Sequence, residues 1–168
     1  DDSRFKKQVS EDGTYGECIF HFFRVLAIGR LNHGYRRHRR SYKESKKFVA
    51  KAAITMPENF SGMSFLVQAE RHSRKNNLIK ATDYYDRALT AFRNNKERLS
   101  EAITYEFMAY HYQKLQQNKI CDLYLKEASY VYELWGAKRK VEKIDHLRTF
   151  LHPSEAVQSM DETSFNLE

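Results

Sequence analysis

Apolar side chains recur every three or four residues along most of the chain, and this spacing predicts amphipathic α-helices. The segment 78–94 is the clearest example, because Ala81, Tyr85 and Ala88 fall on one face of the predicted helix. The pattern breaks at turn-forming residues such as Gly136. About seven helices are predicted, at residues 15–31, 36–54, 58–75, 78–94, 96–115, 119–135 and 137–151.

Two stretches of the chain match each other at an offset of 40 residues. Small residues such as Ala69 and Ala81 let two helix backbones approach to about 8–10 Å, while larger side chains fill the space above them. Self-similarity at this period predicts an all-α fold in which antiparallel helical hairpins stack as a tetratricopeptide-like solenoid. The predicted repeat-packing residues are Ala69, His72, Ala81, Tyr85 and Ala88, matched by Ala109, Tyr112, Cys121, Leu125 and Ala128.

The same pattern divides the chain into segments. Val141, Ile144, Leu147 and Leu151 form a single apolar stripe, which is typical of a terminal capping helix. Periodicity is lost after Pro153, where the chain becomes acidic. We predict a disordered segment or linker at 1–14, an N-terminal helical pair with a basic second helix at 15–54, repeat units at 55–95 and 96–136, a capping helix at 137–152 and an acidic linker at 153–168.

Composition limits the cellular setting. The 168 residues include 6 Gly and 2 Pro, as expected for long regular elements, and contain no run of 18 apolar residues that could span a membrane. The polar start at Asp1 lacks an initiator Met and a signal peptide, so we expect a fragment of a longer cytoplasmic protein. Cys18 and Cys121 lie far apart in the sequence and are expected to be small buried residues in a reducing compartment.

The formal net charge of +7 comes from one window. Residues 30–51 carry 9 positive groups and 1 negative group, whereas residues 52–168 carry 16 of each. This basic cluster is either a solvated face, a contact for an acidic neighbouring domain, or a site for nucleic acid, anionic lipid or another polyanion, with Tyr35, Tyr42 and Phe48 available for stacking. The predicted patch comprises Arg36, Arg37, Arg39, Arg40, Lys43, Lys46 and Lys47.

A second candidate surface follows from the repeats. In a solenoid, the first helix of each pair lines a groove, and Arg71, Lys75, His111 and Lys114 would lie along it. Such a mixed surface suits a peptide or a neighbouring domain. The alternative is that the protein's own flanking helices fill the groove.

No motif for catalysis is visible in the sequence. The glycines do not cluster as a phosphate-binding loop, and the seven histidines form no HxxxH or HExxH pair. We therefore expect no catalytic, cofactor-binding or metal-binding residue in this segment.

Four short sequence segments resemble segments of one protein family. They are Met56-Pro57-Glu58-Asn59-Phe60, Leu66-Val67-Gln68-Ala69-Glu70, Tyr124-Leu125-Lys126-Glu127-Ala128 and Trp135-Gly136-Ala137-Lys138. Together they resemble the helical region of fungal hybrid histidine kinases of the peroxide-sensing type and of related bacterial sensor kinases. The resemblance covers roughly residues 45–145. It implies a parent chain with an AAA-type ATPase module before this segment and a GAF domain, a histidine kinase core and a receiver after it.

The resemblance leads to a functional expectation. The chain would be a noncatalytic interaction and signal-relay segment in a two-component phosphorelay of stress signalling, with neighbouring domains or a protein or peptide as partners and no membrane contact. ATP and Mg²⁺ would serve only other domains of the parent. The alternative is a free-standing basic helical protein that binds nucleic acid, which is the less favoured partner, or another polyanion. His146, in the word Asp145-His146-Leu147-Arg148-Thr149, lacks the acidic neighbour of a phosphoacceptor histidine and is expected to be an ordinary histidine.

Overall fold

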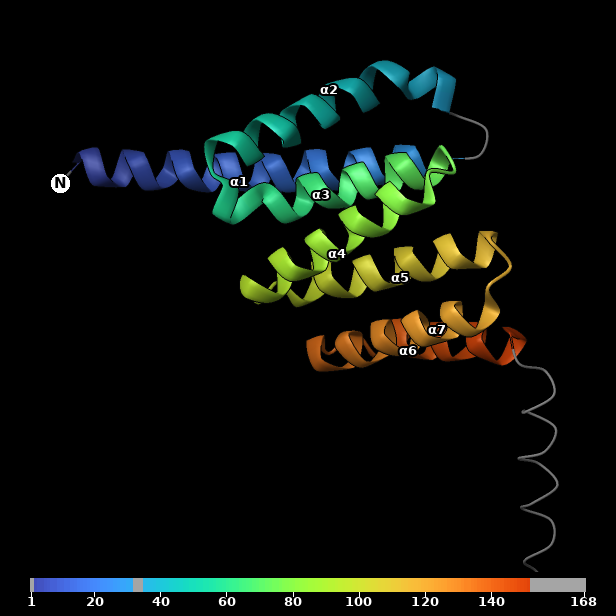
Figure 1. Cartoon of the computed structure of the whole chain (residues 1–168). Helices are drawn as coiled ribbons and strands as arrows, with labels where there is room; N and C mark the ends of the chain where they lie inside the picture. Colours follow the sequence, from blue (N-terminus) through green and yellow to red (C-terminus); the bar gives the residue numbers. More distant parts are fainter. Residues whose placement is uncertain (1, 32–34, 152–168) are drawn as a thin grey trace, which may run out of the picture. The chain divides into compact units, whose positions relative to one another are not determined.

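The computed structural model describes residues 2–31 and 35–151, and every regular element in these two ranges is an α-helix. The all-α prediction is therefore confirmed for the described residues. Residues 32–34, between the first two predicted helices, and the predicted acidic linker at 153–168 lie outside them. The helices are α1 (Asp2–Gly29), α2 (Tyr35–Thr55), α3 (Pro57–Arg74), α4 (Leu78–Asn94), α5 (Arg98–Lys114), α6 (Asn118–Trp135) and α7 (Lys138–Leu151) (Figure 1).

The start of the first helix differs from the prediction. Helix α1 begins at Asp2 rather than at Tyr15, so residues 2–14 belong to a helix and not to a linker. The stretch was predicted as a linker because it lacks an apolar stripe, but it contains no proline. Once a helix has nucleated, each further turn adds hydrogen bonds at little entropic cost, and the apolar segment that begins at Cys18 supplies such a nucleus. The other helix ends fall within two residues of their predicted positions.

The chain divides into two compact units, residues 1–96 and residues 97–168. The first contains α1 to α4, and the second contains α5 to α7. Each unit is described here by itself. The division lies one residue beyond the end that the sequence predicts for its first repeat unit.

The first unit is built around the hairpin of α3 and α4, whose backbones come close together. Ala69, Ala81 and Ala88 expose no surface at all. Gly62 of α3 shows how tight the contact is, because a Cβ atom at this position would lie 2.7 Å from Cε1 of the buried Phe92 ring. Helices α1 and α2 pack on this hairpin and complete the core (Figure 1). The largest buried side chains of the unit include Phe22, Val49, Phe60, Met63, Leu66, Tyr85 and Phe92.

The second unit repeats the hairpin with α5 and α6. Ala109, Cys121 and Ala128 occupy the small-residue positions and are buried. Helix α7 packs on α6, with Ile144 buried and Leu147 half-buried. This arrangement matches the apolar stripe that the sequence predicts for a capping helix.

Polar contacts fasten α7 to the hairpin of the second unit. The buried carboxylate of Glu106 accepts hydrogen bonds from the Tyr132 hydroxyl at 2.8 Å and from the Lys140 ammonium at 2.8 Å. The buried carboxylate of Asp122 accepts from Arg148 Nε at 2.7 Å. Burial alone would raise the pKa of Asp122, but hydrogen bonds and charge from Arg148 and Lys126 outweigh burial and lower it.

The four described turns that follow α3, α4, α5 and α6 each place one residue at a positive φ angle, and these residues recur at a fixed interval. Asn76, Lys96, Gln116 and Gly136 adopt positive φ angles of 55°, 58°, 59° and 87°, and they stand 20 residues apart. At three of these turns, the amide of the next residue donates to a carbonyl five residues earlier, as in a Schellman motif. These bonds run from Asn77 to His72 at 3.0 Å, from Gln117 to Tyr112 at 3.0 Å and from Ala137 to Tyr132 at 2.9 Å. One helix with its turn therefore occupies 20 residues, and this explains the offset of 40 between hairpins.

Two glycines should respond in opposite directions to the same substitution. Gly62→Ala gains about 1 kcal/mol of helix propensity but forces the buried Phe92 ring to move, and such overpacking costs about 1–3 kcal/mol. We expect a net loss of up to about 2 kcal/mol in the free energy of unfolding. Gly16 has nothing within 4 Å of its added Cβ, so Gly16→Ala should stabilise by about 0.5–1 kcal/mol. Urea unfolding followed by far-UV circular dichroism measures both, and a stabilised Gly62→Ala would show that α3 and α4 do not approach this closely.

The ion pairs of Asp122 should make the stability of the second unit depend on pH. Because the folded pKa of Asp122 lies below its ordinary value of 3.8, its contribution is complete above that pH and is lost as the pH falls through the folded pKa. Asp122→Asn should cost about 1.5–3 kcal/mol at pH 7, the range for hydrogen bonds to charged groups, and much less at a pH below the folded pKa of Asp122. Trp135 is the single tryptophan of the chain, so its fluorescence can follow this unit in urea. An equal loss at both pH values would contradict the assignment.

Candidate functional site

A basic pocket in the first unit is the strongest candidate for a functional site. It has a volume of about 570 Å³ and forms where the end of α1, the first half of α2 and the end of α3 meet. Six of its lining residues are cations and none is acidic. The cations are Arg39, Lys43, Lys46, Arg71, Arg74 and Lys75, and the other lining residues are Gly29, Leu31, Tyr35 and Tyr42.

Helical spacing directs these cations into the pocket. On α2, Arg39, Lys43 and Lys46 follow one another at intervals of four and three residues, which places them on one face of the helix. On α3, the cations occupy the last turn and the residue after it. Positive charge is favoured there because the final carbonyl groups of a helix carry partial negative charge.

Arg74 holds the walls of the pocket together. Its guanidinium donates to the carbonyl of Gly29 at 3.1 Å and to the hydroxyl of Tyr42. It also lies over the ring of Tyr42, 4.9 Å from the centroid, and 5.7 Å from that of Tyr35. A Cβ atom at position 29 would lie 3.1 Å from Nη1 of Arg74, so the glycine keeps this space open. Arg74 is thus committed to α1 and α2 and acts as a structural residue.

The remaining cations have no counter-charge. The side chains of Arg39, Lys43, Lys46 and Lys75 make no hydrogen bond or ion pair with the residues whose side chains the structure describes. The nearest acids in the sequence are engaged elsewhere, because Glu44 pairs with Arg40 at 2.9 Å and Glu70 lies 4.0 Å from Arg30 while accepting from the Tyr85 hydroxyl. The pocket therefore carries an unbalanced positive charge.

The ionisation of Lys46 reflects this crowding. Burial lowers the pKa of Lys46, and the positive charges of Arg71, Lys75 and Arg74 lower it further. An ammonium group with a lowered pKa is held where positive charge is unfavourable. A bound anion would relieve that cost.

The pocket brings together residues from two separate sequence predictions. Arg39, Lys43 and Lys46 come from the predicted patch, and Arg71 and Lys75 come from the predicted groove. The other patch residues, Arg36, Arg37, Arg40 and Lys47, do not line the pocket. They are exposed, as are three of the pocket cations, Arg39, Lys43 and Lys75.

The second half of the predicted groove belongs to the other unit. His111 and Lys114 lie on α5, and His111 is buried, with a pKa lowered by burial and by the charge of Lys114. The groove across both units stays a prediction. The sequence did not identify Arg74, because nothing in the periodicity shows that the end of α3 lies beside Gly29 and Tyr42.

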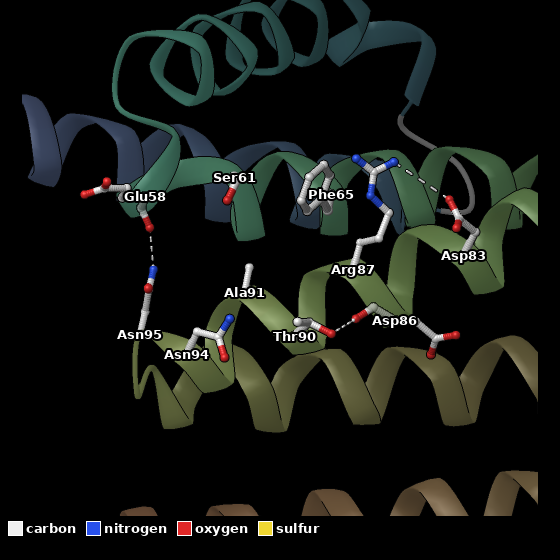
Figure 2. Close-up of a pocket in the computed structure, with 10 residues that line it drawn as sticks. All are labelled: Glu58, Ser61, Phe65, Asp83, Asp86, Arg87, Thr90, Ala91, Asn94 and Asn95. Atoms are coloured by element: carbon white, nitrogen blue, oxygen red, sulfur yellow. Dashed lines mark hydrogen bonds and ion pairs between the residues drawn. The ribbon is translucent and has the colours of Figure 1, made fainter.

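A second pocket of about 640 Å³ lies between α3 and α4 (Figure 2). Its polar side chains largely serve their own hairpin. Arg87 lies 3.9 Å from Asp83 and covers the ring of Phe65 at 4.2 Å. Figure 2 also shows the Asn95 amide donating to the carbonyl of Glu58, at 2.6 Å. No arrangement of nucleophile and base is formed by the residues that line it.

Other candidate groups show structural roles. Cys18 and Cys121 are free and buried, as predicted, and burial raises the pKa of Cys18 to about 11, so its thiol is a poor nucleophile. His146 is exposed and contacts the edge of Phe150, 4.9 Å between centroids. Among the described residues, no three His, Cys, Asp or Glu side chains gather as a metal site. None of the helices in the described ranges is long and apolar enough to cross a membrane.

Comparison with known proteins adds no identification, since no family model, curated protein or solved structure matches the chain.

Crowding of cations in the pocket should make Lys46→Gln stabilising at low salt. At pH 7 the charged Lys46 is disfavoured in the folded state, so its removal should raise the free energy of unfolding by up to about 0.5 kcal/mol near 10 mM salt, where screening extends over about 30 Å. The part of the gain that comes from repulsion by the other cations should fade near 1 M salt, whereas the part that comes from the burial of Lys46 should remain. Urea unfolding at the two salt concentrations measures the gain.

Lys47→Gln is the matched control for this prediction, because Lys47 is the next residue and is exposed outside the pocket. It should change stability less at low salt. If both variants gave the same salt dependence, the repulsion would be a property of the whole helix and not of the pocket.

Proposed function

We propose that this chain is a noncatalytic helical segment that mediates interaction and signal relay within a cytoplasmic, multidomain sensor histidine kinase. Its hairpins would stack as a tetratricopeptide-like solenoid, with α7 as the cap. The partners would be neighbouring domains of the parent chain or a protein or peptide. ATP and Mg²⁺ would serve other domains of a phosphorelay that signals stress.

The observation that carries this proposal is that the hairpins α3–α4 and α5–α6 are built alike. Besides the shared turns and small residues, each hairpin stacks two rings at the same place. His72 lies 5.5 Å from Tyr84 with an interplanar angle of 9°, and Tyr112 lies 5.5 Å from Tyr124 with an angle of 20°. Repeated hairpins of this kind typically serve as scaffolds, since each unit presents similar surface to a partner.

The sensor-kinase origin is supported by the four sequence segments alone. Several of these segments occupy positions with a structural role. Pro57 opens α3 and Phe60 is buried beneath it, while Gly136 ends α6 in the left-handed conformation. Two of the residues that carry the resemblance, Pro57 and Gly136, therefore stand at helix ends.

The origin can be tested on the gene itself. We expect the sequence before residue 1 to encode a nucleotide-binding module and the sequence after residue 168 to encode a GAF-like domain followed by a histidine kinase core. A gene that encodes domains of another class on both sides would refute the proposed parent, while leaving the hairpin scaffold untouched.

The interaction role can be tested by capture of the neighbouring domains. With the whole chain as bait, the double charge reversal Arg71→Glu and Lys114→Glu should reduce recovery of those domains by about tenfold or more, which corresponds to about 1.4 kcal/mol. The matched control reverses two exposed cations outside both the predicted groove and the basic patch, Lys80 and Lys138. Unchanged recovery with the groove variant, or equal losses with both, would contradict a groove contact.

A second candidate function, binding of nucleic acid, is favoured by one observation, the exposed cations of α2 outside the pocket. Binding through phosphates requires a steep fall of affinity with salt, with a slope of about −0.7 per contacted phosphate for single strands. Titration with a generic oligonucleotide at salt concentrations from about 50 to about 200 mM measures this slope. A steep fall in affinity would favour nucleic-acid binding over the interaction segment.

A further inference from the structure

We propose that the basic pocket of the first unit binds a compact ligand that carries two or more phosphate groups. The ligand would be a small molecule with closely spaced phosphates, such as an inositol polyphosphate, a nucleoside triphosphate or a short inorganic polyphosphate. This proposal is independent of the histidine kinase origin, because it rests on the pocket alone.

The first argument is charge. Five cations, Arg39, Lys43, Lys46, Arg71 and Lys75, line the pocket in addition to the committed Arg74, and no carboxylate lines it. Arg71 has one weak contact, from Nη1 to the Gln68 side chain at 3.4 Å, so its guanidinium is available. A single phosphate carries at most two negative charges, which leaves most of this positive charge unbalanced. A ligand with several phosphates matches it better.

The second argument is size. A volume of about 570 Å³ lies within the range of about 300–1,000 Å³ that is usual for small-ligand sites. Acidic peptides carry one charge per residue on separate side chains, so few of their carboxylates fit such a space. Adjacent phosphates place the same charge within a few bonds.

The third argument is preorganisation. Arg74 ties the carbonyl of Gly29 and the hydroxyl of Tyr42 together, so the three helices that carry the cations are fixed relative to one another before any ligand arrives. His21 adds a further tie between α1 and α2, because its Nδ1 lies 3.0 Å from the Ser45 hydroxyl. A site whose walls are already fixed loses less entropy when it binds. A phosphate bound beside Lys46 would raise its lowered pKa, because a negative charge there offsets the nearby cations.

Isothermal titration calorimetry of the whole chain at about 150 mM salt, where the screening length is about 8 Å, tests the proposal. The probes are inositol hexakisphosphate, ATP, tripolyphosphate and inorganic phosphate. We expect at least one of the first three to bind, and inorganic phosphate to bind at least about tenfold more weakly. Their ranking identifies the source of the phosphates. Failure of all three, or equal binding of inorganic phosphate, would overturn the proposal.

Matched variants distinguish the pocket from general attraction to a basic helix. Lys46→Gln and Arg71→Gln each remove one pocket cation, whereas Lys47→Gln and Arg36→Gln each remove one exposed cation outside the pocket. The pocket variants should each weaken binding by about tenfold or more, as expected for a lost charge-assisted hydrogen bond, and the controls by less than about threefold.

Two results would reject the pocket as the site. One is equal weakening by the pocket variants and the controls. The other is an oligonucleotide that binds more tightly than every compact probe and loses affinity with Lys47→Gln. Circular dichroism checks that each variant is folded, and Arg74 is left unchanged because it supports the walls. The gene test of the parent protein is separate, so failure of one proposal leaves the other standing.

Discussion

The close approach of paired helices is the constraint on which the rest of this structure depends. In the first unit, three alanines on α3 and α4 are fully buried, and Gly62 leaves room for the ring of Phe92 where even a methyl group would collide. Where two helices pack this closely, only small side chains fit between the backbones. Most large side chains therefore pack along the edges of the contact between the helices. The stacked rings of His72 with Tyr84 and of Tyr112 with Tyr124 are examples of large side chains that pack beside the small ones. Each hairpin thus buries a narrow seam and needs further helices to cover its remaining apolar surface.

The helices that cover each hairpin also supply partners for its buried acidic side chains. Each hairpin holds one buried glutamate that accepts a hydrogen bond from a buried tyrosine, Glu70 from Tyr85 and Glu106 from Tyr132. Burial, followed by the charge of the neighbouring carboxylate, raises the pKa of each tyrosine, so both remain donors. The countercharge comes from outside the hairpin, since Arg30 follows α1 and Lys140 belongs to α7. A buried carboxylate without such partners would be strongly destabilising. The ion pairs of these two glutamates therefore join the covering helices to the hairpin in each unit.

Periodicity in the sequence predicted the helices well because it records which face each helix buries. Helix α4 begins and ends at the residues expected from Ala81, Tyr85 and Ala88. Periodicity carries less information where no face is buried, and so it missed the first 13 residues of α1, from Asp2 to Thr14. The predicted break between residues 115 and 119 contains the turn at Gln116, but Lys96 was predicted as the first residue of a helix, since lysine is not typical of the left-handed conformation that it adopts. The basic cluster was visible as composition, but its gathering with Arg71 and Lys75 depends on how α2 packs on α3, which no local pattern encodes.

The basic pocket carries an electrostatic cost for the folded chain. Like charges gathered in a partly buried site repel one another, and a fold under selection for stability alone would place an acid among them or move them apart. Here the acids on both helices are turned to other partners, Glu44 to Arg40 and Glu70 to Arg30 and Tyr85. The one arginine that is fully engaged, Arg74, uses its hydrogen bonds to fix the walls and leaves its neighbours unpaired. A preformed site that gathers charges of one sign lowers the stability of the folded chain, and such sites are typical of ligand binding. In the proposed complex, the ligand would supply the countercharge.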